Sequence, residues 1–136
     1  MALKHWLVKS EPSVYSYDQL AADGCTVWDG VRNYAARIHL NGMQKNDLVL
    51  YYHSMDATEV VGIAKVVRTA FPDPTDNEGK WVAVELTSHK KLKNSVPLSK
   101  IKAEKKLQNI ALVRIGRLSV MPLAKDEFDC IVNMGA

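Results

Sequence analysis

The chain has 136 residues, of which 47% are hydrophobic and 24% charged, and its formal net charge is +3. This length and balance predict one globular domain over residues 1–136, since domains cluster at roughly 100–150 residues. No window approaches the roughly 18 apolar residues of a membrane span, and residues 1–9 lack the apolar stretch of a secretory signal. We therefore expect no membrane partner and a location in the cytoplasm, or in the nucleus of a eukaryote.

The first apolar segment is short and bounded by charge, which predicts a strand over residues 5–9. Ser10 and Glu11 follow it, and Pro12 ends it because proline disfavours helical backbone in the residue before it. A hydroxyl and a carboxylate are therefore expected at the exit of a strand. They form either a polar turn or two groups aimed into a cleft.

The stretch from residue 28 to residue 37 reads Trp-Asp-Gly-Val-Arg-Asn-Tyr-Ala-Ala-Arg. Asp29 or Gly30 can begin a helix there, because aspartate accepts hydrogen bonds from free N–H groups and glycine allows a tight entry. Two interpretations stay open: an ordinary surface helix with solvated arginines, or donors that hold a planar or anionic ligand beside Trp28. Helical spacing predicts a buried face made of Val31, Tyr34, Ala35 and Ile38.

Three apolar or alternating runs predict the middle of a sheet. One of them ends in His53 and Ser54, where the histidine is either a structural residue or part of a site. Another contains Gly62, and a glycine inside a strand indicates a bulge or a close approach of another group, which helps a sheet to curl. The runs cover residues 48–54, 59–69 and 81–87.

The last third of the chain is less regular. Residues 92–96 predict a short link, and residues 107–114 fit a helix or a strand equally well. A short extended piece is expected at 117–122, and residues 124–133 predict a final helix with Phe128 facing inward. Strands first, with small helices between and after them, predict an α+β domain with a curled, barrel-like sheet.

The chain lacks the common motifs of cofactor and metal chemistry. It has no glycine-rich phosphate loop and no HExxH, and its two cysteines are about a hundred residues apart without a CxxC pair, so we expect no cofactor and no metal. A Ser–His–acid set would need the neighbours His53 and Ser54 to meet, yet adjacent strand residues point to opposite faces. The remaining aromatic, arginine and polar side chains fit recognition of a base, because aromatic faces stack bases, polar groups contact their edges and arginines pair with phosphate.

Five segments then match a known pattern in order: Trp-Leu-Val-Lys-Ser-Glu-Pro (6–12), the stretch 28–37, Tyr-His-Ser (52–54), Val-Val-Gly-Ile-Ala (60–64) and Arg-Leu-Ser-Val (117–120). Together they resemble the EVE domain, a member of the PUA-like superfamily related to the YTH and ASCH domains, and the group of thymocyte nuclear proteins and their bacterial relatives. The resemblance implies an α+β fold: a PUA-like open mixed β-barrel of about five or six strands, with short helices around it and a pocket at its mouth. The chain departs from the family's usual residues at four positions: Ala35 (usually Gln), Ile38 (Asn), Asn46 (Gly) and Phe128 (Trp).

Members of this family are described as readers of modified bases, including 5-substituted cytosines, in DNA or RNA. The resemblance therefore implies a non-enzymatic, nucleic-acid-binding module that recognises a modified nucleobase extruded from a strand. Two alternatives stay open, namely an enzyme that processes nucleotides or nucleic acid with Glu11 or His53 as acid–base group, and a protein that binds a small anionic metabolite. The oligomeric state is also open, with a monomer as one option. The ligand-binding residues implied are Ser10, Glu11, Trp28, Arg32, Asn33, Tyr34, Arg37, His53, Ser54, Arg117 and Ser119.

Overall fold

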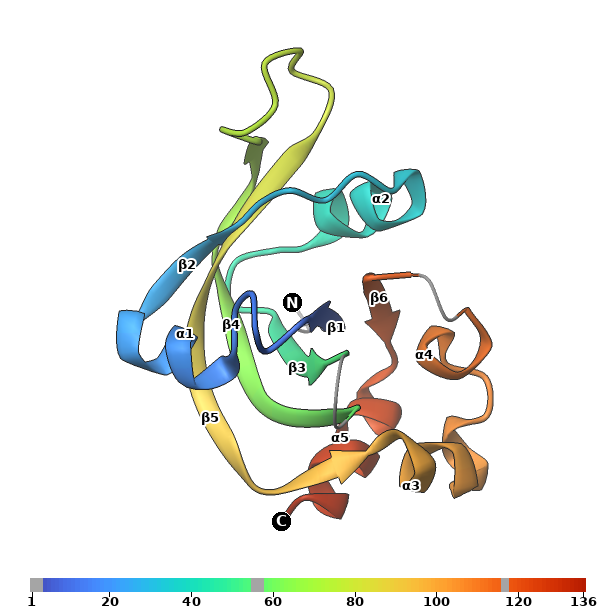
Figure 1. The fold of residues 1–136 in the computed structure, drawn as a ribbon. Coiled ribbons are helices and arrows are strands. Elements are labelled where there is room, and N and C mark those ends of the chain that lie inside the picture. Colours follow the sequence, from blue (N-terminus) through green and yellow to red (C-terminus); the bar gives the residue numbers. More distant parts are fainter. Residues whose placement is uncertain (1–3, 55–57, 116–117) are drawn as a thin grey trace.

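A computed structural model describes residues 4–54, 58–115 and 118–136, and within these ranges the chain forms a six-stranded mixed sheet (Figure 1). The strand order is β2-β5-β4-β3-β1-β6, with β1 parallel to β3 and the other neighbours antiparallel. The edge strands β2 and β6 are not paired with each other in this order, so the curled sheet stays open, as the family resemblance implied. The strands are β1 (His5–Ser10), β2 (Cys25–Trp28), β3 (Leu48–His53), β4 (Glu59–Pro72), β5 (Val82–Pro97) and β6 (Val120–Leu123).

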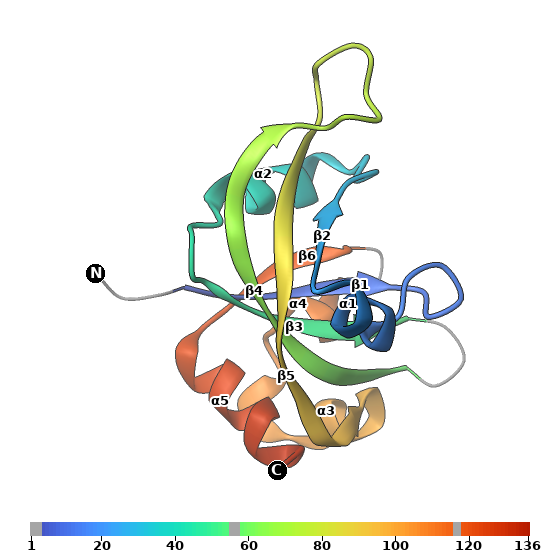
Figure 2. The same ribbon diagram turned by 90° about the vertical axis from the view of Figure 1, so that its left-hand side faces the viewer.

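Short helices surround this sheet. In both ribbon views α2 lies beside the long β4–β5 hairpin, whereas α3 and α5 lie at the opposite end of the sheet (Figures 1 and 2). In the part of the chain that the structure describes, no helix has the length and apolar character to cross a membrane. The helices are α1 (Tyr17–Asp23), α2 (Tyr34–Gly42), α3 (Leu98–Ala103), the 3-10 helix η1 (Lys105–Leu107), α4 (Ala111–Arg114) and α5 (Lys125–Met134).

Gly62 lies where the sheet curls, as its position inside a strand predicted. The β4–β5 register shifts between Val60 and Gly62. A Cβ atom at Gly62 would lie 2.6 Å from the ring of Tyr17, and the Tyr17 hydroxyl donates to the carbonyl of Ile63 at 2.8 Å. The glycine therefore lets helix α1 place an aromatic ring flat against the strand.

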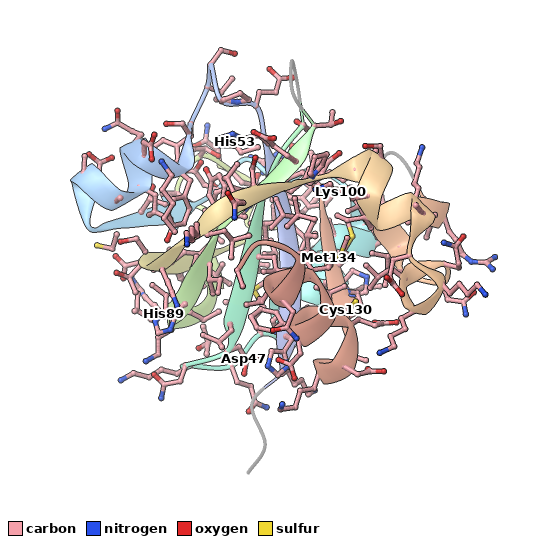
Figure 3. The ribbon with its side chains drawn as sticks, turned by 90° about the horizontal axis from the view of Figure 1, so that it is seen from below. Asp47, His53, His89, Lys100, Cys130 and Met134 are labelled. Atoms are coloured by element: carbon pink, nitrogen blue, oxygen red, sulfur yellow. The ribbon has the colours of Figure 1, made fainter. Side chains whose placement is uncertain are left out.

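Asp47, just before β3, is a buried carboxylate that holds the start of the sheet. It accepts hydrogen bonds from the backbone N–H of Lys4 at 3.0 Å, the indole N–H of Trp6 at 2.9 Å and the backbone N–H of Gln44 at 2.8 Å. The preceding Asn46 has a φ of 77°. This left-handed turn accounts for the family's usual glycine at this position, and asparagine is the residue that tolerates it best after glycine. Figure 3 shows Asp47 and His53 at the two ends of β3.

The helix expected from Asp29 or Gly30 begins later, and its predicted face is wrong. Helix α2 starts at Tyr34, because the side chain of Asn33 caps it by accepting from the N–H of Ala36 at 3.0 Å. Its buried residues are Ala36 and Leu40, whereas Ile38 and Tyr34 are each 66% exposed. The departures from the family pattern at residues 35 and 38 therefore lie on the exposed surface.

The C-terminal third differs from the sequence prediction in one strand. Residues 92–96, expected as a link, belong to the 16-residue strand β5, which crosses the sheet with several register shifts. The ambiguous residues 107–114 contain the end of η1 and all of α4, with a turn at 108–110 between them. The final helix is α5, with Phe128 buried against the ring of His5 at a centroid distance of 4.6 Å.

Candidate ligand-binding site

A cavity of about 530 Å³ opens beside the ends of β1 and β2. Ser10 lies at the end of β1 and Trp28 at the end of β2, and the loop after Trp28 completes the wall. The cavity is therefore built by segments that are far apart in the sequence but meet where two strands end. It is lined by Lys9, Ser10, Val14, Tyr15, Thr26, Val27, Trp28, Asp29, Gly30, Val31, Arg32 and Ser119.

The Trp28 ring is held in place by an aromatic neighbour. It meets the buried ring of Tyr51 edge to face, with centroids 5.5 Å apart and planes at 85°. The Tyr51 hydroxyl donates to the carbonyl of Tyr15 at 2.7 Å. Burial raises the pKa of Tyr51 to about 12, so this donor keeps its proton across the physiological range. Trp28 thus packs against the core while it lines the cavity.

Arg32 lines the same cavity, and a second loop holds its guanidinium. Its Nη1 donates to a carboxylate oxygen of Asp73 at 3.0 Å, and its Nη2 donates to the hydroxyl of Thr75 at 3.1 Å. The same Asp73 oxygen accepts from the N–H of Gly30 at 2.8 Å. Asp73 follows the end of β4, so this contact fastens the cavity loop to the tip of the β4–β5 hairpin.

The Asp73 carboxylate is stable as an anion despite its burial. Burial alone would raise its pKa, but hydrogen bonds from Thr75, Arg32 and Gly30 outweigh that effect and lower the pKa to about 2. The Asp73 side chain is fully buried, whereas that of Arg32 is 40% exposed. The charge of Arg32 is therefore largely balanced by Asp73, which leaves its outer edge to meet a ligand.

A second hollow of about 500 Å³ shares one wall with the cavity. The shared wall consists of Lys9, Ser10 and Ser119, where the N–H of Lys9 donates to the carbonyl of Ser119 at 2.9 Å. Glu11 and Ser54 line this second hollow and not the first. Burial lowers the pKa of Lys9.

His53 lies outside both hollows. Its Nε2 accepts a hydrogen bond from the backbone N–H of Tyr17 at 3.2 Å, at the first residue of α1. Burial lowers the pKa of His53, which favours the neutral ring that this bond requires. His53 faces a separate hollow of about 290 Å³ together with Tyr17 and Asp18.

The remaining site residues expected from the sequence lie along the start of α2 or outside the described part. Asn33 uses its side-chain oxygen as the helix cap. Tyr34 and Arg37 pack with Trp81 on the surface and are not part of the cavity lining. Arg117 lies outside the described residues. Of the eleven residues, the structure thus places Ser10, Trp28, Arg32 and Ser119 in one cavity, and their ligand contacts stay predictions.

Sequence reasoning missed three residues that shape this region. Tyr15 lines the cavity, and Asp73 and Trp81 hold Arg32 and Arg37. The sequence only weakly indicates a structural role for Asp73, because this residue stands between two prolines in a segment typical of an exposed loop. Its burial depends on partners more than forty residues away, which no local pattern reveals.

An open mixed barrel with a hollow beside the ends of β1 and β2 belongs to the PUA-like class of folds. Comparison with known proteins agrees, since the ASCH protein of Zymomonas mobilis has the same fold at a TM-score of 0.62 and 12% identity, over 98% of this chain and 96% of that one. The model of the EVE domain family matches residues 4–134. The chain therefore belongs to the EVE domain family.

Two solved relatives are much more similar. An NMR structure of a protein from Rhodopseudomonas palustris is 46% identical with a TM-score of 0.93, over 98% of this chain and 93% of that one. Human THYN1, crystallised in complex with DNA that contains 5-methylcytosine, is 31% identical with a TM-score of 0.89, over 97% of each chain. Against the full human protein, thymocyte nuclear protein 1, the identity is 30% and the match covers 96% of this chain and 73% of that protein.

Proposed function

We propose that this chain is a non-enzymatic module that binds DNA by taking a modified base, 5-methylcytosine or another 5-substituted cytosine, into the Trp28 cavity. One observation carries the proposal: an indole packed against the core and a guanidinium lie in the wall of a single hollow of about 530 Å³. Its size falls within the roughly 300–1,000 Å³ of small-ligand sites. The relation to human THYN1, which was crystallised with DNA of this kind, selects the ligand class.

The cavity lining suits a base that has left its stack. Base–aromatic stacking contributes about 1–3 kcal/mol, and Trp28 presents the ring for it. The hydroxyls of Ser10 and Ser119 lie in the same wall and are assigned to the edge of the base. A base in a duplex must be extruded to reach such a pocket, so single-stranded or mismatched sites should bind more readily than paired ones.

Apolar side chains in the lining suit a 5-methyl group. Val14 and Val27 line the cavity and remain 75% and 37% exposed, so they have surface left to cover. Burying one methyl group contributes about 0.8 kcal/mol, which is a roughly fourfold difference in affinity. We therefore assign to these valines the preference for a methylated cytosine over an unmodified one.

The test is a binding titration with oligonucleotides that differ only in one cytosine methyl group, as DNA and as RNA, at several salt concentrations. We expect tighter binding of the methylated DNA, by roughly fourfold, at every salt concentration. Trp28→Ala should weaken binding of both forms, and Trp28→Phe should retain part of it, because phenylalanine still stacks. Equal affinity for both forms in the unmodified chain, or no binding of either, would rule the proposal out.

The cellular location of the module follows only from which nucleic acid it binds. A DNA preference fits the cytoplasm of a bacterium or the nucleus of a eukaryote, and the RNA arm of the titration tests the other nucleic acid.

A further inference from the structure

An aromatic and cationic cluster, made of Tyr34, Arg37 and Trp81, lies on the surface where α2 meets the β4–β5 hairpin. The rings of Tyr34 and Trp81 are 5.1 Å apart at 37°. The guanidinium of Arg37 lies 4.9 Å from the Tyr34 ring and 5.2 Å from the Trp81 ring. Its Nη1 also donates to the carbonyl of Lys80 at 2.9 Å. Arg37 thus contacts both rings at once.

The cluster is continuous with the cavity through Arg32. The guanidinium of Arg32 lines the cavity and also lies 5.7 Å from the Trp81 ring. Arg32 in the cavity wall thus contacts Trp81, and Trp81 in turn contacts Tyr34. A stacked strand advances roughly 3.4 Å per nucleotide, so a strand that places one base in the cavity reaches the cluster within a few nucleotides.

The charges around the cluster favour stacking over phosphate binding. Arg32 is paired with the buried Asp73, and the half-buried Asp76 of the same hairpin accepts from the N–H groups of Lys80 and Trp81. These carboxylates oppose the charge that Arg37 adds. A locally balanced surface attracts phosphate weakly, whereas an aromatic face stacks bases with little regard to charge.

Tyr34 keeps most of its surface exposed although it packs with Trp81 and Arg37. It is 66% exposed, at the first position of α2, and Arg37 already fastens the helix to the hairpin through Lys80. We propose that Tyr34 and Trp81 form a stacking platform for an unpaired base of the same strand, within a few nucleotides of the base held in the cavity. This inference rests on the proposed function, because it takes the strand's path from the base in the Trp28 cavity.

The test uses Tyr34→Ala with a matched control in the same helix. Ile38 is also 66% exposed and lies one turn further on, so Ile38→Ala removes a comparable exposed apolar side chain without an aromatic ring. The probe is a single-stranded oligonucleotide with one 5-methylcytosine, whose neighbouring nucleotides on both sides are either intact or abasic. Thermal unfolding of each variant checks that the fold is kept.

With intact neighbours we expect Tyr34→Ala to weaken binding roughly tenfold, as expected for one lost stacked base, and Tyr34→Phe and Ile38→Ala to stay close to the unmodified chain. With abasic neighbours the effect of Tyr34→Ala should vanish. Equal effects of Tyr34→Ala and Ile38→Ala would overturn the platform. So would the same loss on the abasic probe, which would indicate a phosphate or sugar contact.

These results separate the platform from the proposed function. A chain that shows no preference for the methylated probe, but loses affinity on Tyr34→Ala only when neighbouring bases are present, would support the platform and reject the modified-base role. The reverse result, a methyl preference with no effect of Tyr34→Ala, would reject the platform alone.

Discussion

Asp47 and Asp73 are both buried, at 1% and 2% exposure, but they bind different kinds of partner. Asp47 accepts from three N–H groups without charge, two from the backbone and one from the indole of Trp6. Asp73 accepts from two backbone N–H groups, from the hydroxyl of Thr75 and from the guanidinium of Arg32. One carboxylate is thus held entirely by neutral donors, and the other is also part of an ion pair.

The two carboxylates also hold different parts of the molecule. Asp47 joins the start of β1 to the turn before β3, and so fixes two paired strands of the core. Asp73 joins the loop that lines the cavity to the tip of a hairpin, and so fixes the site more than the core. A buried carboxylate therefore stabilises the core of the fold in one place and the cavity loop in the other. Substitutions at the two positions should separate stability from binding.

Asp47→Ala should have the largest effect on stability. It leaves three N–H groups without their acceptor, one of them the buried indole N–H of Trp6, and each such loss costs about 1–3 kcal/mol when water cannot replace it. We expect the free energy of unfolding to fall by about 3 kcal/mol or more, measured by urea denaturation. Asp18→Ala, which removes an exposed ion pair with Lys91, is the control and should change it by less than about 1 kcal/mol. Similar losses for both variants would contradict the importance of the buried acceptor.

Asp73→Ala should reduce binding as well as stability. It frees Arg32 and the N–H of Gly30, so the cavity loop loses its attachment to the hairpin. We expect affinity for the methylated oligonucleotide to fall about tenfold or more, and the free energy of unfolding to fall by roughly 1–2 kcal/mol. Glu78→Ala, which removes an exposed carboxylate of the same hairpin loop, is the matched control and should leave both close to unchanged. Unchanged affinity in Asp73→Ala would show that the attachment does not matter for the site.

The strands of this fold were largely predictable because apolar runs bounded by turn residues mark them. The first strand, the strand that ends in His53 and the strand that contains Gly62 were all expected near their observed positions. Helix α2 was harder to predict, since Asp29, Gly30 and Asn33 are all plausible starting residues. Val31 is buried although it precedes the helix, so including it shifted the predicted face onto residues that the structure exposes.

The candidate site was only partly predictable for a related reason. Trp28 and Arg32 come to one cavity because the segment that carries them turns at Gly30, which has a φ of 76°. Arg37, five residues further on, lies beyond the start of the helix and turns to the surface cluster instead. Two arginines of one motif therefore lie in different places. The long-range partner Asp73 binds the one that lines the cavity.

Acid should reveal the contribution of Asp73 to stability. Its pKa is lowered from the ordinary 3.8 to about 2, so the unfolded chain takes up the proton at higher pH than the folded chain does. The stabilisation is therefore fully present above about pH 5 and is lost as the pH falls toward about 2. The measurement is the difference in free energy of unfolding between the unmodified chain and Asp73→Asn, which should shrink steadily over that range. A difference that stays constant down to about pH 2.5 would indicate that the carboxylate charge contributes nothing.

The smallest effect is expected at the turns beside the two carboxylates. Asn46 precedes Asp47 with a φ of 77°, and Gly30 donates to Asp73 with a φ of 76°. Asn46→Gly should raise the free energy of unfolding by less than about 1 kcal/mol, because relief of the left-handed conformation is partly offset by the greater freedom of glycine in the unfolded chain. Gly30→Ala should lower it by about 1 kcal/mol through backbone strain alone, since no atom lies within 4 Å of the added Cβ.

Gly30→Asn provides the control for that last comparison, because asparagine tolerates the left-handed region better than alanine does. It should therefore retain more stability and more affinity for the methylated oligonucleotide than Gly30→Ala. If the two variants behave alike, the conformation of Gly30 does not set the position of Arg32, and the contact with Asp73 alone must hold the cavity loop. Urea denaturation and the same binding titration measure the two quantities for each variant.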